Sequence, residues 1–350
     1  MRTDLFDFDL PPGLIAQEPA RPRDAARLLY VPADDGPFAE RAVGDLPDLL
    51  RPGDLLVLND TRVLPTRLAG RRGDVPFEAT LVERAGDAAW WALARPGKRL
   101  RPGDRVGFDG GLAATVEAKD EEGRVRFGFA LSGENLLAAI RAHGAMPLPP
   151  YIRRPRGGTR GDRDDYQPVF ARREGAVAAP TASLHFTPEL LARLEERGVR
   201  RTFATLHVGA GTFAPVKVED VRDHRMHAEW YEVSEDTAAQ VAAARAAGGR
   251  IVAVGTTALR ALESAAAEDG TVRPSTAETR LFITPGYRFR AVDLLLTNFH
   301  LPRSTLLMLV AAFSGLERAR AAYAFAVERR YRFFSYGDAC LLERAGEGGR

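Results

Sequence analysis

The sequence is poor in cysteine and in long apolar runs, and each shortage excludes a class of protein. Cys340 is the only cysteine among 350 residues. An internal disulfide, a cysteine-bound structural zinc and an iron–sulfur cluster are therefore excluded, and with the cluster any radical chemistry that needs one. No apolar run approaches the roughly 18 residues that span a bilayer, and the N-terminus lacks the basic start and apolar block of a signal peptide. We therefore expect a cytoplasmic protein with no membrane partner.

The sequence also has little net charge, with a formal value of only +2. Almost all of the cations are arginine and they are unevenly distributed, so local clusters carry more information than the total. Codon bias in a genome rich in G and C is sufficient to explain the overall excess of arginine and alanine. With 45% hydrophobic residues, the chain can bury a core in two domains, or in one large domain with an insertion.

The pattern of apolar, polar and turn-forming residues changes twice along the chain. Residues 1–66 read as an irregular segment that ends in a short buried strand at 55–58. Between 67 and 131, short alternating runs separated by Gly, Pro and Asp turns predict a small antiparallel barrel. A Pro-, Gly- and Arg-rich stretch then follows the helical pattern at 134–142 and forms a long loop or a domain junction.

Helical and strand patterns alternate in the rest of the chain. Helices are expected at 188–197, with a Thr187 cap and Pro188 in the first turn, and then at 236–247, from about 257, and at 305–313. Strands are expected at 202–208, 251–254, near 280–284 and at 292–298, several of them parallel with crossover helices. The predicted fold is thus a larger mixed α/β domain, residues 1–66 plus 149–350, with a β-barrel domain inserted at 67–148.

The segment VGTTALR places Gly255, Thr256 and Thr257 where a buried strand turns into a helix. The first free N–H groups of such a helix can bind a carboxylate or a phosphate. A capped helix with no ligand explains the same residues.

The segment TLHVGAGTF places His207 beside Gly209 and Gly211. It is a poor match to a dinucleotide-binding turn, because Pro215 follows and no amphipathic helix begins after the glycines. Glycines do allow close approach of a ligand to the backbone, so His207 is a candidate site residue.

Three further histidines lie in segments that could form a site. His185 follows a run of small residues, and His227 lies two residues before Glu229 in an H-x-x-H-x-E pattern whose spacing does not suit zinc, so no metal is expected. In TNFHLPRST, the residues Asn298 and His300 occupy the loop after a buried strand, where open α/β sheets bind ligands. For each histidine, a structural role and a catalytic one remain open.

Arginines gather in the loop after residue 150, where Arg153 and Arg154 precede Arg156, Arg160 and Arg163, with Tyr151 and Tyr166 on either side. Such a loop suits phosphate contacts and base stacking on single-stranded RNA. A solvated linker has the same composition.

Nine ordered blocks of the sequence together resemble one family, the S-adenosylmethionine:tRNA ribosyltransferase-isomerases of queuosine biosynthesis. The blocks are DFDLPPGLIAQEPA with RDAARLL, LLVLNDTRVLPTRL, PLPPYIRR, GAVAAPTASLHFT, TLHVGAGTFAPV, HRMHAEWYEV, RIVAVGTTALRALES, TNFHLPRSTLLMLVAAF and YRFFSYGDA. They cover nearly the whole chain and are far more specific than any single glycine motif.

The resemblance implies the fold and the reaction. The fold is a larger α/β domain with an inserted small β-barrel. The reaction transfers the ribosyl part of S-adenosylmethionine to preQ1 at the wobble position of tRNA, giving epoxyqueuosine with loss of adenine and methionine. S-adenosylmethionine is then a co-substrate, and no further cofactor is expected.

Roles for individual residues follow from this reaction as hypotheses. A base that is neutral near pH 7 should be a histidine, His185 or His207 first, then His227 and His300. The donor site would comprise Asp60, Thr61, Gly209, Gly211, Glu229, Gly255, Thr256, Thr257, Asn298 and Phe299. The tRNA phosphates would be held by Arg62, Arg153, Arg154 and Arg303.

Two other functions compete with this reaction. One is an S-adenosylmethionine-dependent RNA methyltransferase, which is disfavoured because no glycine-rich cofactor turn follows an early strand. The other is a non-catalytic RNA-binding protein in which the histidines are structural. A monomer is expected in each case.

Overall fold

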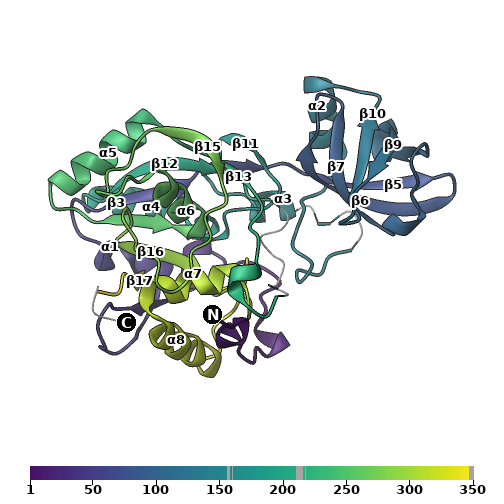
Figure 1. Cartoon of the computed structure of the whole chain (residues 1–350). Helices are drawn as coiled ribbons and strands as arrows, with labels where there is room; N and C mark the ends of the chain where they lie inside the picture. The colour runs from purple at the N-terminus through teal and green to yellow at the C-terminus, as the bar shows by residue number, and fades with distance from the viewer. Residues whose placement is uncertain (156–157, 160, 210–215, 217, 347–350) are drawn as a thin grey trace. The chain divides into compact units, whose positions relative to one another are not determined.

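A computed structural model describes residues 1–346 except 156, 157, 160, 210–215 and 217 (Figure 1). The chain forms two compact units: Met1–Thr61 with Pro168–Arg173 and Pro180–Arg350, and Arg62–Gln167 with Glu174–Ala179. The first is a mixed α/β unit and the second contains a closed antiparallel barrel. The predicted fold class is therefore confirmed. The barrel unit extends beyond the range 67–148 inferred from sequence texture.

The α/β unit is built on a nine-stranded sheet with the order β15-β13-β12-β3-β14-β16-β17-β1-β2. Its strands are β1 (Arg27–Val31), β2 (Ala39–Ala42), β3 (Leu55–Asn59), β12 (Arg200–Leu206), β13 (Glu229–Val233), β14 (Ile251–Val254), β15 (Ser275–Thr279), β16 (Leu294–Asn298) and β17 (Ala339–Glu343). The four central strands β12, β3, β14 and β16 are parallel, as predicted. All five residues of β3 and of β16 are buried, as expected for a sheet covered on both faces.

The longer helices of this unit flank the sheet. They are α4 (Pro188–Glu196), α5 (Glu235–Ala246), α6 (Gly255–Ala265), α7 (Thr305–Ser314) and α8 (Leu316–Glu328), with the short α1 (Leu46–Leu49). The Thr187 hydroxyl accepts a hydrogen bond from Leu190 N at 3.1 Å, so the predicted cap of α4 is confirmed. The strand expected near 280–284 is wrong, because β15 occupies Ser275–Thr279 and the following residues leave the sheet.

The barrel closes in the order β10-β7-β6-β5-β8-β9. Its strands are β5 (Arg67–Arg72), β6 (Val75–Arg84), β7 (Ala89–Arg95), β8 (Arg105–Phe108), β9 (Ala113–Lys119) and β10 (Val125–Phe129), and α2 (Gly133–His143) follows them. Phe77, Phe108 and Phe127 pack against one another inside it, with ring centroids 5.4–6.0 Å apart. The barrel thus has an apolar core of its own.

Two small elements lie where the chain passes between the units. Strands β4 (Thr61–Val63) and β11 (Arg173–Ala176) pair as a separate two-stranded sheet. The one-turn helix α3 (Asp162–Asp165) interrupts the loop after residue 146. Among the described residues, none of the helices has the length and apolar character needed to span a membrane.

Strand order identifies the edge of the sheet where a ligand is expected. The chain leaves β3 and next enters the sheet at β12 on one side, whereas it leaves β14 and enters β16 on the other. Open α/β sheets bind ligands beyond the carboxyl ends of their strands at such a switch point. The residues that follow β12, β3, β14 and β16 are therefore the candidates for a site.

Candidate active site

Asn59, the last residue of β3, links the end of β3 to the end of β12 and to the start of α6. Its amide nitrogen donates to the Leu206 carbonyl and to the Thr257 hydroxyl, each at 3.0 Å. Its amide oxygen accepts from the backbone N–H of Thr61 and of Leu206. Every hydrogen-bonding position of this buried amide is used, so Asn59 fixes the ends of β12, β3 and α6 relative to one another.

His207, directly after β12, lies half-exposed at this edge. Its Nδ1 is 2.8 Å from the Thr61 hydroxyl, and its ring stacks on Trp230 with centroids 4.8 Å apart. Burial lowers the pKa of His207 below its ordinary value, with the Asp60 carboxylate acting in the opposite direction. The imidazole is therefore neutral near pH 7.

The Thr61 hydroxyl also determines which nitrogen of His207 carries the proton. Thr61 Oγ1 lies 3.4 Å from the Arg173 carbonyl, which can only accept a hydrogen bond. Both contacts of the single hydroxyl are hydrogen bonds only when Thr61 donates to that carbonyl and accepts from Nδ1–H of His207. Nε2 is then the unprotonated nitrogen, and within the described part of the chain it has no hydrogen-bond partner.

Asp60 lies beside Thr61 and is 3% exposed. Its carboxylate accepts from the Thr205 hydroxyl at 2.6 Å and from Arg172 at 3.1 Å. It faces a polar cavity of about 270 Å³, whose lining also includes Arg173 and Glu232. Because Arg172 is 62% exposed and Asp60 is buried, the Arg172 side chain can leave the pair for solvent, whereas the Asp60 carboxylate stays in place.

Glu229 begins β13 and is bound on both sides. One carboxylate oxygen accepts from the Gly209 N–H at 3.1 Å, and the other pairs with Arg260 of α6. The Glu229 and Arg260 side chains are each only 5% exposed. Glu229 thus anchors the start of the glycine segment, and Gly211 lies outside the described residues. Pairing with Arg260 leaves Glu229 less suited to contact the donor than its place in the predicted donor site implies.

The turn from β14 into α6 lies where the sequence predicts that a buried strand turns into a helix. Gly255 has φ of +86°, a left-handed conformation that disfavours residues with a side chain. Thr256 and Thr257 follow in the first turn, and no side chain caps this end of α6. The partial positive charge of this N-terminus therefore lies at the switch point of the sheet.

His185 is buried, and its ring is held by Asn298. The Asn298 amide nitrogen lies 3.2 Å from both His185 Nε2 and the Phe334 carbonyl, while its oxygen accepts from Thr181 at 2.9 Å. Since the Phe334 carbonyl can only accept, the amide nitrogen points to His185 and Nε2 must be unprotonated. Burial lowers the pKa of His185 to about 4.

The residues after Asn298 turn into the core. Phe299 is fully buried, with its ring packed against those of Tyr331 and Phe333. The His300 ring bonds the Thr297 hydroxyl at 2.8 Å, and burial lowers its pKa to about 3. We therefore revise the assignment of Phe299 to the donor site, and His300 is a weaker base candidate than His207.

The remaining candidates are more widely spread. His227 is exposed, four residues beyond the short 3-10 turn at 221–223. Arg303 has φ of +55° and donates to the Thr3 hydroxyl at 3.3 Å. In the barrel unit, Arg62 and Arg153 are exposed, whereas the Arg154 side chain is 7% exposed and pairs with Asp162 at 2.8 Å. Arg154 is thus less available for a phosphate than its neighbours.

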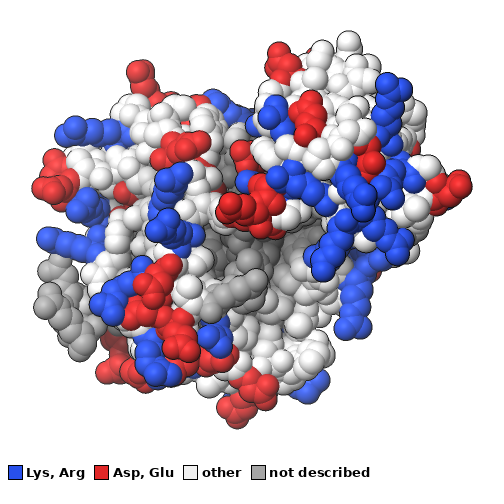
Figure 2. Space-filling model, turned by 45° about the vertical axis from the view of Figure 1, so that its right-hand side comes forward, with Lys and Arg blue, Asp and Glu red and all other residues white. Residues whose placement is uncertain are grey.

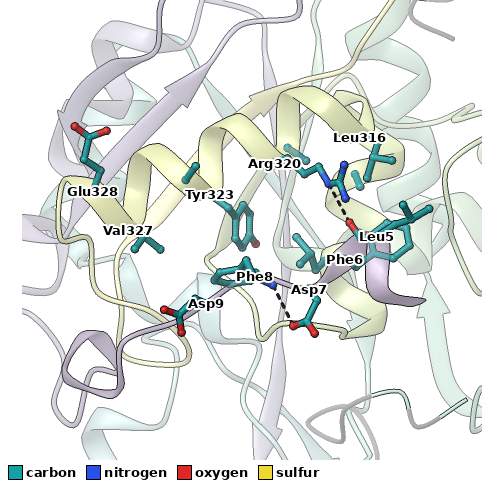
Figure 3. Close-up of a pocket in the computed structure, with 14 residues that line it drawn as sticks. Leu5, Phe6, Asp7, Phe8, Asp9, Leu316, Arg320, Tyr323, Val327 and Glu328 are labelled. Atoms are coloured by element: carbon teal, nitrogen blue, oxygen red, sulfur yellow. Dashed lines mark hydrogen bonds between the residues drawn. The ribbon is translucent and has the colours of Figure 1, made fainter. Parts of the chain in front are cut away.

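An apolar pocket lies apart from these residues. It has a volume of about 510 Å³ between the N-terminal segment and helix α8. Figure 3 shows the Phe8 ring beside Tyr323, with Val327 and Leu316 along the helix. None of the sequence-predicted site residues lines it. Among the described residues, no group of three or more His, Cys, Asp or Glu could hold a metal.

Sequence reasoning missed Trp230, Arg260 and Thr181, each of which contacts a candidate residue. Trp230 was recoverable in principle, because β12 pairs antiparallel with β13 and brings Trp230 opposite His207. That pairing requires recognising β13, whose five residues carry no turn signal at their start. Arg260 and Thr181 had no sequence signal, since their partners come from distant segments.

The fold and this arrangement define the class of protein, an α/β enzyme with an inserted β-barrel that carries a neutral histidine, a buried carboxylate and a helix start at the sheet's switch point. The chain belongs to the queuosine biosynthesis protein family, whose sequence model matches residues 3–342.

Several relatives share its full length. A protein of Azorhizobium caulinodans named S-adenosylmethionine:tRNA ribosyltransferase-isomerase is 60% identical over 98% of this chain and 100% of its own. One of the same name from Phenylobacterium zucineum is 62% identical over 97% of this chain and 99% of its own. A crystal structure of S-adenosylmethionine tRNA ribosyltransferase from Thermotoga maritima superimposes with a TM-score of 0.54 at 38% identity, covering 97% of this chain and 99% of that one.

Proposed function

We propose that this protein is an S-adenosylmethionine:tRNA ribosyltransferase-isomerase. It transfers the ribosyl part of S-adenosylmethionine to preQ1 at the wobble position of tRNA and isomerises it, and adenine and methionine are released. The observation that carries the proposal is the match along the whole chain to relatives that bear this name at about 60% identity. Both units are included in that match.

The site supports a particular role for His207. The sulfonium of the donor acidifies the adjacent C5′–H, and a neutral base must remove that proton before the preQ1 amine captures the ribosyl fragment. Among the described residues, Nε2 of His207 has no hydrogen-bond partner; the ring is partly exposed and lies beyond the carboxyl ends of the parallel strands. His185 and His300 are buried and have ring nitrogens bound by Asn298 and Thr297, so they serve better as structural groups.

Other groups at this edge suit the rest of the donor. The start of α6 at Gly255, Thr256 and Thr257 offers backbone N–H groups to the methionine carboxylate. The buried Asp60 carboxylate provides negative charge near His207, which stabilises a cationic sulfonium or the imidazolium formed when His207 takes the proton. S-adenosylmethionine enters as a co-substrate, and the chemistry requires no further cofactor.

The tRNA must present preQ1 unstacked, which an anticodon loop permits more readily than a duplex. Arg62, Arg153 and Arg303 are the phosphate-binding candidates that remain accessible in part. The proposal includes a cytoplasmic protein, because tRNA is the substrate, and a monomer, as the sequence analysis expects. Light scattering of the purified protein tests the monomer.

The test is to incubate the purified protein with S-adenosylmethionine and preQ1-containing tRNA and to follow the products by mass spectrometry. Adenine and methionine should appear in equal amounts, in step with epoxyqueuosine-tRNA. S-adenosylhomocysteine instead would show methyl transfer and refute the proposal. Intact donor beside bound tRNA would indicate a non-catalytic RNA-binding protein.

A further inference from the structure

One corner of the barrel is rich in cations that lack acidic partners. Residues 95–105 contain Arg95, Lys98, Arg99, Arg101 and Arg105, and all five are exposed. None of them forms an ion pair within the described part of the chain. Figure 2 shows Lys and Arg side chains gathered over the part of the molecule that carries the barrel. We call these five residues the barrel-corner cations.

The only acid in this segment is already engaged. The Asp104 carboxylate accepts from the Arg101 backbone N–H at 2.7 Å and from Arg72 at 3.1 Å. These contacts lower the pKa of Asp104, so the carboxyl stays ionised and bound. Its charge is therefore shared with Arg72, a side chain outside the corner, and it forms no ion pair with any of the five cations.

The backbone that carries the cations is held in place. Leu100, between Arg99 and Arg101, is 2% exposed and belongs to the apolar core of the barrel. Lys119, at the end of β9, donates to the Gly97 carbonyl at 2.6 Å, and Gly103 donates to Val116 of the same strand at 2.8 Å. A fixed array of cations loses less conformational entropy on binding than a flexible loop would.

We propose that the barrel-corner cations bind the phosphate backbone of the substrate tRNA, outside the site where the chemistry occurs. The inference rests on the proposed function, because that function supplies a polyanionic partner. Unpaired Arg and Lys side chains on a rigid scaffold are the groups that contact phosphates without reading sequence. The surface thus contributes affinity and orientation rather than catalysis.

The test compares K98Q/R99Q/R101Q with a control of equal charge change, R41Q/R200Q/R273Q, made at exposed arginines of the α/β unit. Binding of preQ1-containing tRNA is measured by filter binding at several KCl concentrations. The barrel variant should lower the slope of log Kd against log salt by about two to three, and weaken binding roughly 10- to 100-fold near 0.1 M salt. The control variant should change this slope by less than about one, the value expected for the loss of a single phosphate contact.

Two further measurements keep the result interpretable. Donor binding by calorimetry should be equal in both variants, which shows that each is folded, and the charge-retaining K98R/R99K/R101K should restore tRNA affinity. The inference is overturned if the barrel variant binds tRNA with the affinity and salt slope of the control, in which case these cations serve another partner or none. Failure of the wild type to release adenine and methionine would refute the proposed function instead. The binding comparison would still decide whether the barrel-corner cations bind tRNA.

Discussion

Replacing Thr61 with valine tests whether His207 is the base, because the substitution keeps the shape of the side chain and removes only the hydroxyl. In the wild type that hydroxyl accepts from Nδ1–H of His207 and leaves Nε2 unprotonated. In T61V, Nδ1–H loses its hydrogen-bond partner, so the ring can carry its proton on Nε2 instead. A protonated Nε2 cannot accept the proton of the donor and therefore cannot act as the base.

The expected size of the effect comes from the lost hydrogen bond. Leaving a partly buried donor unsatisfied costs about 1–3 kcal/mol. If this cost falls on the reactive tautomer alone, kcat should drop roughly 10- to 100-fold, at about 1.4 kcal/mol for each factor of ten. H207Q should lose more, on the order of 100- to 10,000-fold, because the base itself is removed. T61S, which keeps a hydroxyl, should retain most of the activity.

The assay is adenine release at saturating donor and tRNA, measured across pH. Burial lowers the pKa of His207, so the neutral base persists to lower pH than in a free histidine. When the assay is repeated at limiting donor, kcat/KM, which reports the pKa of the ligand-free enzyme, should therefore rise with pH through an apparent pKa below 6.5 and then level off. H143Q, at an exposed histidine of the barrel unit that is not a candidate base, is the matched control and should behave as wild type.

A different ordering of the variants would refute the reasoning. If H207Q kept near-normal kcat, His207 could not be the base whatever Thr61 did. If T61V and T61S were equally impaired, the effect would come from packing at residue 61 and the tautomer argument would fail. Loss of activity in H227Q alone would transfer the role to that histidine.

Three further predictions concern stability. The pKa values of His185 and His300 are lowered to about 4 and about 3, so below pH 6.5 the unfolded chain binds more protons than the folded chain. The free energy of unfolding should therefore fall as the pH drops from about 6.5 towards 4. A urea midpoint that stays constant over this pH range would contradict the burial of the two histidines as neutral groups. R260M should cost about 3–5 kcal/mol in denaturant unfolding because it leaves Glu229 buried without its partner, whereas a loss below 1 kcal/mol would show that the pair is not buried. T187A should cost about 1 kcal/mol through the lost cap of α4, and no shift in the urea midpoint would disprove that role.

Local patterns were sufficient for much of the fold. The alternating runs at 67–131 predicted the barrel, because each strand there has one face in the core and one in water. Continuous apolar runs at 55–58 and 251–254 predicted the buried parallel strands. Strands β1 and β2 were missed, since β2 exposes much of its length and offers no alternation to detect.

The site was harder to infer because its geometry depends on pairings between distant segments. The sequence identified His207 and Thr61 as candidates, but only the structure shows that the two side chains touch across 146 positions. The sequence placed His185 and His207 ahead of His227 and His300 but could not choose between the first two, and burial separates them: His185 lies inside the unit with His300, whereas His207 reaches its surface. Burial of a single polar residue is a property of the assembled layers, which no local pattern records.

The position of β17 has a consequence for how the protein is made. Strand β17, at Ala339–Glu343, lies between β16 and β1, so it alone joins the β1–β2 hairpin to the rest of the sheet. Strand β1, the first to be synthesised, is therefore paired on both sides only after β17, the last, has formed. Until residue 343 has left the ribosome, the growing chain exposes the facing edges of β1 and β16, both rich in leucine. Protection of these edges by a chaperone during synthesis would matter more for this protein than for one whose neighbouring strands are consecutive in the chain.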